Sequence, residues 1–251
     1  MHKGSDVIGK LPPALDPGAA LFLDVDGTLL EIAARPDLVE VPAWLPGLVA
    51  RCAEERGGAL ALISGRSLGQ LDRLFQPWRG AAAGLHGAER RRADGSFAPA
   101  CASEAIARLR PRLADLARTG TGLAIEDKGA ALALHYRAVP EREAEILAFA
   151  ERLSRAAAPG LRLIEGKMVV EFVPAESDKG TAISAFLAEP PFRGRRPVFV
   201  GDDATDEDGF AAVDRHAGIS VRVGPSGVTA AKYRLASVTA VLAWLGGSGN
   251  V

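Results

Sequence analysis

The chain has 251 residues, which fits one large domain or two small ones, and its 48% hydrophobic and 24% charged residues are typical of a globular protein. The formal net charge of -1 excludes the strongly basic surface with which proteins hold nucleic acids. It leaves room for a small anionic substrate in one basic pocket.

The chain begins with a proline-containing leader up to Ala19 and ends with a Gly/Ser-rich tail from Gly246, and both are expected to be loosely attached. The first ten residues have no apolar signal core, and no apolar run approaches the ~20 residues of a membrane span. Cys52 and Cys101 form no metal or disulfide pattern. We therefore expect a cytoplasmic monomer with neither a membrane nor a nucleic-acid partner.

Short apolar runs alternate with helical patterns in the two outer parts of the chain, which predicts an α/β fold with a mostly parallel sheet. The expected strands are residues 20–25, 59–63, 81–85, 197–200 and 219–223. Helices are expected from Pro42, over 68–75, from Lys179 and over 238–245.

Residues 89–172 have a different pattern. Helical periodicity at 106–116 and 141–153 accompanies strand-like runs at 122–126, 130–136, 161–164 and 168–172. The strands are expected to pair as hairpins, for example across residues 127–129. The sequence therefore predicts a discontinuous core, residues 1–88 and 173–251, that carries an inserted α+β domain, residues 89–172.

The strongest chemical signal is the run Asp24–Leu29, Asp-Val-Asp-Gly-Thr-Leu, directly after the first apolar strand. Asp24 and Asp26 project to the same side of an extended backbone, at the strand end where α/β sheets bind ligands. Gly27 permits a sharp turn and Thr28 supplies a hydroxyl group. The alternative is a purely structural role, in which these polar residues end the strand and begin a turn.

Residues 201–208, Gly-Asp-Asp-Ala-Thr-Asp-Glu-Asp, place several carboxylates at another strand end with no basic residue among them. Unpaired, these acids would raise one another's pKa, and a hard cation would relieve the repulsion. Oxygen-only ligands suit Mg²⁺. The alternative is a solvated acidic loop at a helix start, and Asp208 fits that reading.

Two weaker signals complete a phosphate site. Ser64, Gly65 and Arg66 lie between a strand and a helix, where a hydroxyl and backbone N–H groups suit a phosphate. Lys179 opens a helix, an unfavourable place for a cation unless an anion lies beside it. Taken singly, a plain helix cap and a surface lysine are the simpler readings.

These four motifs, in this order at strand ends, resemble those of the haloacid dehalogenase (HAD) superfamily of Mg²⁺-dependent phosphatases. The resemblance implies a Rossmann-like core with a parallel sheet and an inserted C2-type cap. Further segments are similar to the trehalose-6-phosphate phosphatase family: 84–87, 126–128, 135–137, 165–167 with Glu171, and 201–208. The resemblance covers about residues 21–245. The stretch before Lys179 reads Phe-Val-Pro-Ala-Glu-Ser-Asp where the family more often has Arg-Pro.

The resemblance implies Mg²⁺-dependent hydrolysis of trehalose 6-phosphate to trehalose and phosphate, the last step of trehalose biosynthesis. Asp24 would be the nucleophile that becomes an aspartyl-phosphate, Asp26 the general acid/base, and Lys179 a catalytic cation. Mg²⁺ would be held by Asp24, the main-chain oxygen of Asp26, Asp202 and waters, with Asp203 and Asp206 either behind these groups or as additional ligands. Phosphate would be bound by Thr28, Ser64, Gly65, Arg66 and Lys179. The sugar would be read by Glu126, Lys128 and Glu165, with Lys167, His135 and Arg137 as weaker candidates.

The sequence is also compatible with other functions of these residues. Glu126 and Lys128 could be a surface ion pair, and His135 and Arg137 could simply support a strand. A HAD phosphatase for another sugar phosphate would have the same core motifs. A catalytically inactive sugar-phosphate-binding module would be expected to lack Asp24, Asp26 or the acidic run, all of which are present. Dinucleotide and P-loop fingerprints are absent from the sequence.

Overall fold

The computed structural model describes residues 10–33, 38–98, 104–118, 122–156, 160–225 and 227–246. The chain divides into two compact units, which we call the core unit (Met1–Ala98 with Asp178–Val251) and the inserted unit (Pro99–Ser177). The boundaries between the units, after Ala98 and after Ser177, lie further along the chain than the boundaries predicted from sequence at 88/89 and 172/173. One reason is that β4 (Glu89–Arg91) pairs with the core sheet, and another is that β8 (Val169–Pro174) runs on in the second sheet.

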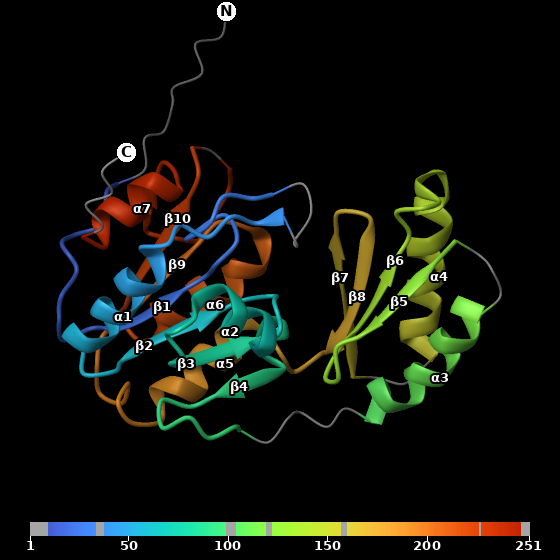
Figure 1. Cartoon of the computed structure of the whole chain (residues 1–251), viewed down its shortest axis with the longest axis horizontal. Helices are drawn as coiled ribbons and strands as arrows, with labels where there is room; N and C mark the ends of the chain where they lie inside the picture. Colours follow the sequence, from blue (N-terminus) through green and yellow to red (C-terminus); the bar gives the residue numbers. More distant parts are fainter. Residues whose placement is uncertain are drawn as a thin grey trace, which may run out of the picture. The chain divides into compact units, whose positions relative to one another are not determined.

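The core unit is built on a seven-stranded sheet in the order β11-β10-β9-β1-β2-β3-β4 (Figure 1). All neighbours pair in parallel except β3 and β4, which pair antiparallel. Its remaining strands are β1 (Ala20–Leu23), β2 (Leu60–Ile63), β3 (Ala81–Gly84), β9 (Pro197–Gly201), β10 (Ile219–Val223) and β11 (Tyr233–Leu235). The predicted α/β class with a parallel sheet is therefore confirmed.

Helices cover both faces of this sheet, which explains why its strands are continuous apolar runs. Alternate residues of β1 divide between two cores: Leu21 and Leu23 face one, and Ala20 and Phe22 face the other. The first core is closed by α1 (Leu45–Glu55), α2 (Leu68–Phe75) and α7 (Val238–Trp244). The second is closed by α5 (Lys179–Leu187) and α6 (Glu207–Arg215).

The leader is attached to the core unit over its described part, contrary to the expectation. The main-chain oxygen of Lys10 accepts a hydrogen bond from the Arg234 N–H at 2.9 Å. The Trp244 indole N–H donates to the main-chain oxygen of Pro13 at 2.9 Å, and Leu15 packs against the first core. Prolines therefore mark an extended docked segment here. Residues 1–9 and the tail beyond Gly246 lie outside the described residues.

The inserted unit has a four-stranded antiparallel sheet in the order β5-β6-β8-β7, with β5 and β6 paired as the predicted hairpin. Its other elements are β5 (Ala124–Asp127), β6 (Leu132–His135), β7 (Leu161–Gly166), α3 (Glu104–Arg118) and α4 (Glu143–Ala156). Both helices pack on one face of the sheet, where Leu132, Leu134, Val170 and Phe172 join their apolar side chains in one core. The opposite, helix-free face carries polar side chains that are described below.

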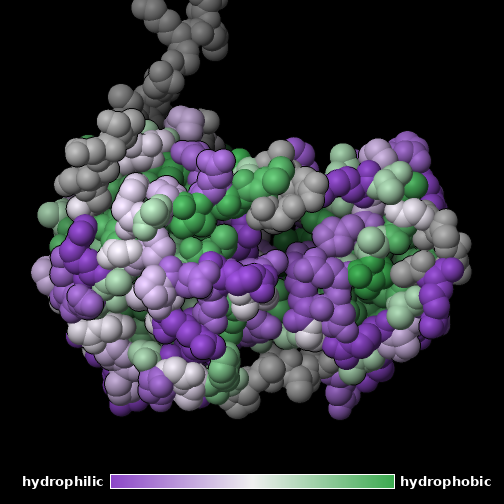
Figure 2. Space-filling view, in the orientation of Figure 1, coloured by the Kyte–Doolittle hydropathy of each residue, from purple (hydrophilic) through white to green (hydrophobic). Residues whose placement is uncertain are grey.

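Apolar side chains are concentrated in these three cores. Figure 2 shows mixed and largely hydrophilic side chains on the drawn face of each unit. Among the described residues, the large apolar side chains left exposed are few: Leu11, Ile32, Leu38, Trp44, Phe97 and Val228. Within the same residues, every helix is too short or too polar to cross a bilayer.

Candidate active site

The candidate active site lies at the carboxyl ends of β1, β2 and β9. Asp24 directly follows β1 and is buried, and its N–H donates to the main-chain oxygen of Val200 on the neighbouring strand β9 at 3.0 Å. Gly27 turns the chain away with φ +79°. A Cβ at Gly27 would lie 2.1 Å from Oδ2 of Asp202, so a side chain there would displace that carboxylate. The motif thus needs glycine for both turn and space.

Lys179 connects the two acidic motifs. It is the first residue of α5, its side chain is buried, and its Nζ donates to Oδ1 of Asp24 at 2.8 Å and to Oδ1 of Asp206 at 2.7 Å. Although burial opposes the charged form, the negative charges of Asp206 and Asp24 raise the pKa of Lys179 above its ordinary value. The ammonium is therefore charged and fixed between two carboxylates.

Asp206 organises the loop after β9. Its Oδ2 accepts hydrogen bonds from the N–H groups of Asp202 at 2.8 Å and Asp203 at 3.0 Å. The Asp203 carboxylate is engaged differently, since its Oδ1 accepts from the N–H of Thr205 at 2.8 Å and from the hydroxyl of Thr205 at 2.7 Å. Asp206 therefore shapes the loop that presents Asp202, while Asp203 caps the following turn.

Three carboxylates form a group suited to a cation. One oxygen from each of Asp24, Asp202 and Asp206 lies within 4.8 Å of the other two. Burial raises the pKa of Asp24 and of Asp206, and burial with the charges of Asp206 and Asp203 raises the pKa of Asp202 to about 6. A hard cation would stabilise the ionised forms, and oxygen donors are the ligands such cations take. The residues present therefore fit a metal ion.

Asp26 and Arg66 face each other across the site. Arg66 follows β2, and its Nε donates to Oδ2 of Asp26 at 2.7 Å while its Nη2 donates to Oδ1 at 2.6 Å. This bidentate geometry is the strong form of a carboxylate–guanidinium contact. The sequence placed Arg66 on the phosphate; here Arg66 holds the carboxylate predicted to be the acid/base.

Two hydroxyl groups lie in the same region. Thr28 is fully buried, and its Oγ1 has no hydrogen-bond partner among the described residues. Such an unsatisfied buried hydroxyl is costly unless a ligand completes it. Ser64 is buried too, and its Oγ accepts from the N–H of Arg66 at 3.1 Å, which fixes the start of the loop before α2.

In the inserted unit, four polar residues share the helix-free face of the sheet. Lys128 Nζ donates to Oε1 of Glu171 at 2.6 Å, and His135 Nε2 lies 3.0 Å from Oε2 of Glu126. Their strand positions agree, because Glu126 and Glu171 are both paired across from Ala133. The alternative of a Glu126–Lys128 ion pair is wrong, since Lys128 pairs with Glu171 and Glu126 with His135 on this one surface.

The other predicted sugar-reading residues lie elsewhere on this unit. Glu165 is paired across from Val170, whose side chain lies in the core under α3 and α4, so Glu165 belongs to the opposite face from Glu126. Lys167 and Arg137 are exposed beyond the strand ends, and the described residues supply neither with a hydrogen-bond partner.

Residues 22–239 match the sequence model of the family described as Trehalose-phosphatase. The chain belongs to this family. It is 46% identical over 222 residues to a probable trehalose-phosphate phosphatase of Sinorhizobium fredii, covering 88% of this chain and 83% of the relative. It is also 46% identical over 234 residues to the trehalose-6-phosphate phosphatase of Escherichia coli, covering 93% and 87%. The prediction of a phosphoric monoester hydrolase that acts on a small sugar phosphate is confirmed.

Solved structures share the fold. A crystal structure of a trehalose-6-phosphate phosphatase related protein superposes with a TM-score of 0.72 at 26% identity, covering 90% of this chain and 95% of that one. A phosphatase of the HAD superfamily from Bacteroides thetaiotaomicron superposes with a TM-score of 0.60 at 18% identity, covering 98% of both chains. The expected HAD-type fold is therefore confirmed.

Sequence reasoning noted Glu171 in a family-like segment but gave this residue no role. Glu171 stands between the buried residues Val170 and Phe172 of β8, and strict alternation places it on the other face of the sheet. Pairing with Lys128 adds a cross-strand partner 43 positions away. The alternation was visible in the sequence, whereas the partner was not.

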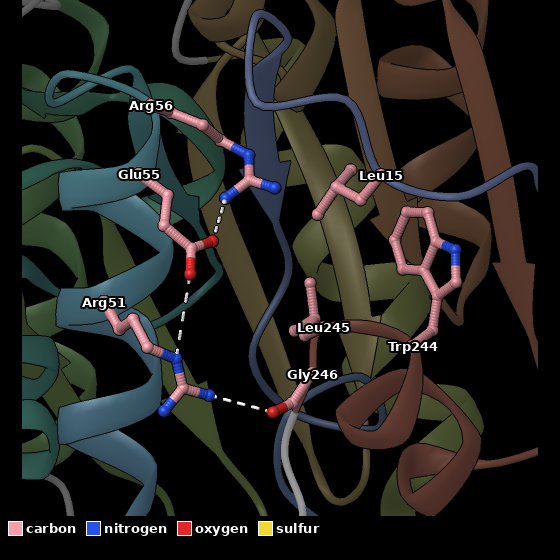
Figure 3. Close-up of a pocket in the computed structure, with 7 residues that line it drawn as sticks. All are labelled: Leu15, Arg51, Glu55, Arg56, Trp244, Leu245 and Gly246. Carbon is pink, nitrogen blue, oxygen red and sulfur yellow. Dashed lines mark hydrogen bonds and ion pairs between the residues drawn. The ribbon is translucent and has the colours of Figure 1, made fainter.

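A separate pocket of about 380 Å³ lies elsewhere on the core unit (Figure 3). It is lined by residues from the ends of α1 and α7 and from the leader: Leu15, Arg51, Glu55, Arg56, Trp244, Leu245 and Gly246. Because α1 ends just before β2 begins, its last turn lies at the amino ends of the strands. The pocket is therefore at the opposite edge of the sheet from Asp24 and contains none of the predicted site residues.

Proposed function

We propose that the protein hydrolyses trehalose 6-phosphate to trehalose and phosphate, with Asp24 as the nucleophile and Mg²⁺ as the metal. The observation that carries this proposal is the position of Lys179, 2.8 Å from Asp24 and 2.7 Å from Asp206. This buried cation offsets part of the charge of the two carboxylates, so that a phosphate dianion can approach the nucleophile when a metal ion offsets the rest. The names of the relatives supply the substrate.

In the first step, Oδ2 of Asp24 attacks phosphorus and the bond to the sugar oxygen breaks, which leaves an aspartyl-phosphate. Asp26 gives a proton to the departing sugar oxygen. In the second step, Asp26 takes a proton from a water molecule that attacks phosphorus, and Asp24 is released with inorganic phosphate. Arg66 holds Asp26 as a carboxylate through both oxygens, so one of these two contacts opens whenever Asp26 carries the proton.

Other core residues would hold the phosphate oxygens. The Thr28 hydroxyl is a buried donor that a phosphate oxygen would complete, and Ser64 and the N–H groups of its loop lie at the neighbouring strand end. Mg²⁺ would be held by Asp24, Asp202 and the main-chain oxygen of Asp26, with Asp206 and Asp203 behind them, and when bound it supplies positive charge that offsets the phosphate.

The inserted unit would act as the cap that selects the sugar, through the helix-free face of its sheet. Carboxylates accept hydrogen bonds from sugar hydroxyls, and Lys128 and His135 add donors. We therefore place Glu126, Lys128, His135 and Glu171 in the sugar-reading surface. Glu165 lies on the opposite face, and Lys167 and Arg137 lie beyond the strand ends, so these three serve as comparison positions.

The nucleophile is tested by Asp24→Asn, with the exposed Asp94→Asn as the matched control. The first variant is expected to keep its fold, measured by circular dichroism, and to lose all phosphate release, while the control is unchanged. Phosphate release by Asp24→Asn at a tenth of the parent rate would reject the assignment.

The sugar-reading face is tested by Glu126→Ala and Glu171→Gln against Glu165→Ala. We expect the first two to lower kcat/KM for trehalose 6-phosphate by about 10-fold or more while kcat/KM for an aryl phosphate stays within about threefold. The Glu165 variant should behave like the parent on both substrates. Equal losses on both substrates would remove the sugar-reading role.

A further inference from the structure

The turn that follows β3, residues 84–89, has an unusual backbone. Leu85 and His86 have φ values of +49° and +54°, in the left-handed region that non-glycine residues seldom adopt, and Gly87 follows at +103°. Two consecutive strained residues persist only where surrounding contacts fix them, and such residues cluster at functional sites. The contacts that fix this turn are made with the loop after β2 and with the start of α5.

The turn is bonded to the loop that carries Ser64 and Arg66. The N–H of Leu85 donates to the main-chain oxygen of Arg66 at 3.0 Å, and the N–H of His86 donates to that of Ser64 at 3.0 Å. At the other end of the turn, Oε2 of Glu89 accepts from the N–H of Leu68, the first residue of α2, at 3.0 Å. The left-handed turn therefore holds the backbone of the loop from Ser64 to Leu68 in place through these hydrogen bonds.

The imidazole ring of His86 packs directly on this loop. A Cβ at Gly65 would lie 2.6 Å from Nε2 of His86, so the ring occupies the space that a side chain at Gly65 would need. Gly87 makes a second close approach, since a Cβ there would lie 2.5 Å from the main-chain oxygen of Asp178, the residue before Lys179. One turn thus contacts both segments that present groups to the proposed phosphate site.

We propose that His86 is a positioning residue for phosphate binding. Its ring and the left-handed turn fix the loop of Ser64 and Arg66 at a set distance from the start of α5, and thereby set the spacing between these groups and Lys179. This inference rests on the proposed function of the site. His86 acts through Gly65 and the loop backbone and takes no part in proton transfer.

The test is the affinity for inorganic phosphate, measured by calorimetry on the full chain with Mg²⁺, together with kcat and KM for an aryl phosphate. His86→Gly removes the ring and relieves the strain, so its melting temperature should equal or exceed that of the parent. We expect the Kd of phosphate and the KM each to rise about 10-fold and kcat to fall less, because the displaced loop removes Ser64 from the phosphate in both the ground and transition states.

Two further variants separate position from backbone strain. Gly65→Ala displaces the ring while His86 remains, and it should reproduce the rise in Kd and KM. Ala217→Gly changes another left-handed residue, with φ +52° at the end of α6, and should leave both constants unchanged. His86→Gly with a phosphate Kd within about twofold of the parent value would overturn the inference. A parent protein that binds phosphate but releases none from trehalose 6-phosphate would instead overturn the proposed function and leave this inference standing.

Discussion

Arg66 and Asp26 form a two-point contact, with Nε 2.7 Å from Oδ2 and Nη2 2.6 Å from Oδ1. The guanidinium fork matches both carboxylate oxygens, so it fixes the direction and the plane of the carboxylate. Asp26 follows β1 and Arg66 follows β2, and the parallel pairing of these strands brings the two residues together. The orientation of the proposed acid/base therefore depends on an arginine from the neighbouring strand.

We expect Arg66→Lys and Arg66→Gln to lower kcat by about 10-fold or more, because neither side chain holds both oxygens in one plane. Steady-state kinetics with trehalose 6-phosphate measure this. Arg79→Lys, at an exposed ion pair with Asp72, is the matched control. An Arg66→Lys variant with the parent kcat would show that charge alone is sufficient.

Removal of the Asp206 carboxylate should weaken the core unit. Asp206→Asn places an amide where Lys179 and two backbone N–H groups need an acceptor, and it leaves the Lys179 charge partly uncompensated. Loss of one partner of a buried pair costs about 3 kcal/mol of unfolding free energy. Urea titration in the presence of a chelator measures the difference, with Asp94→Asn as the control. A loss below about 1 kcal/mol would contradict the structural role.

Metal affinity should fall at acidic pH. Burial and neighbouring acids raise the pKa of Asp202 to about 6, and a protonated carboxyl group binds Mg²⁺ poorly. The apparent Kd of Mg²⁺ at pH 5 is therefore expected to be about 10-fold higher than at pH 7. Calorimetric titration of the parent protein with Mg²⁺, in the absence of substrate, measures this. A Kd that is constant over this range would argue against Asp202 as a ligand.

The ion pairs of Glu189 should make the free energy of unfolding fall at acidic pH. Arg90 holds both oxygens of Glu189 at 2.8 and 2.9 Å, and Arg92 adds a contact at 3.2 Å. These hydrogen bonds hold the pKa of Glu189 below its ordinary value. Because the unfolded chain then binds the proton more tightly, this stabilisation is present above pH 4.5 and is lost as pH falls through the folded pKa.

The corresponding variant is Glu189→Gln, compared with the parent by denaturant titration from pH 3 to pH 7. The variant should be less stable than the parent at pH 7, and the two curves should converge at the acid end. A difference in unfolding free energy that stays the same at pH 3 and pH 7 would show that the carboxylate charge contributes nothing.

The parallel sheet could be predicted from sequence because its strands are apolar on both faces and end in polar motifs. β4 and β11 could not be predicted, because their short segments show no apolar run. Glu89–Arg91 carries charged residues with no apolar run, and it becomes a strand through pairing with β3 and through Arg91, which contacts Asp72 and Gly80. Tyr233–Leu235 is a three-residue edge strand whose pairing with β10 supplies its order.

The site was likewise predictable only in part. The order of the motifs predicted that Asp24, Lys179 and the acidic loop lie together, because strand ends at one edge of a parallel sheet converge. The partner of each side chain was beyond reach of the sequence. The contact of Arg66 with Asp26 could not be predicted, and neither could the position of Glu165, which was expected to bind sugar with Glu126 and lies on the other face of the sheet.

The central claim is tested most directly by phosphate release from trehalose 6-phosphate, sucrose 6-phosphate and a glycerol-linked sugar phosphate, each with Mg²⁺ and with a chelator. The account predicts release from trehalose 6-phosphate with Mg²⁺, at least about 10-fold higher kcat/KM than for the other two, and none with the chelator. Equal rates on all three substrates, or undiminished release with the chelator, would contradict it.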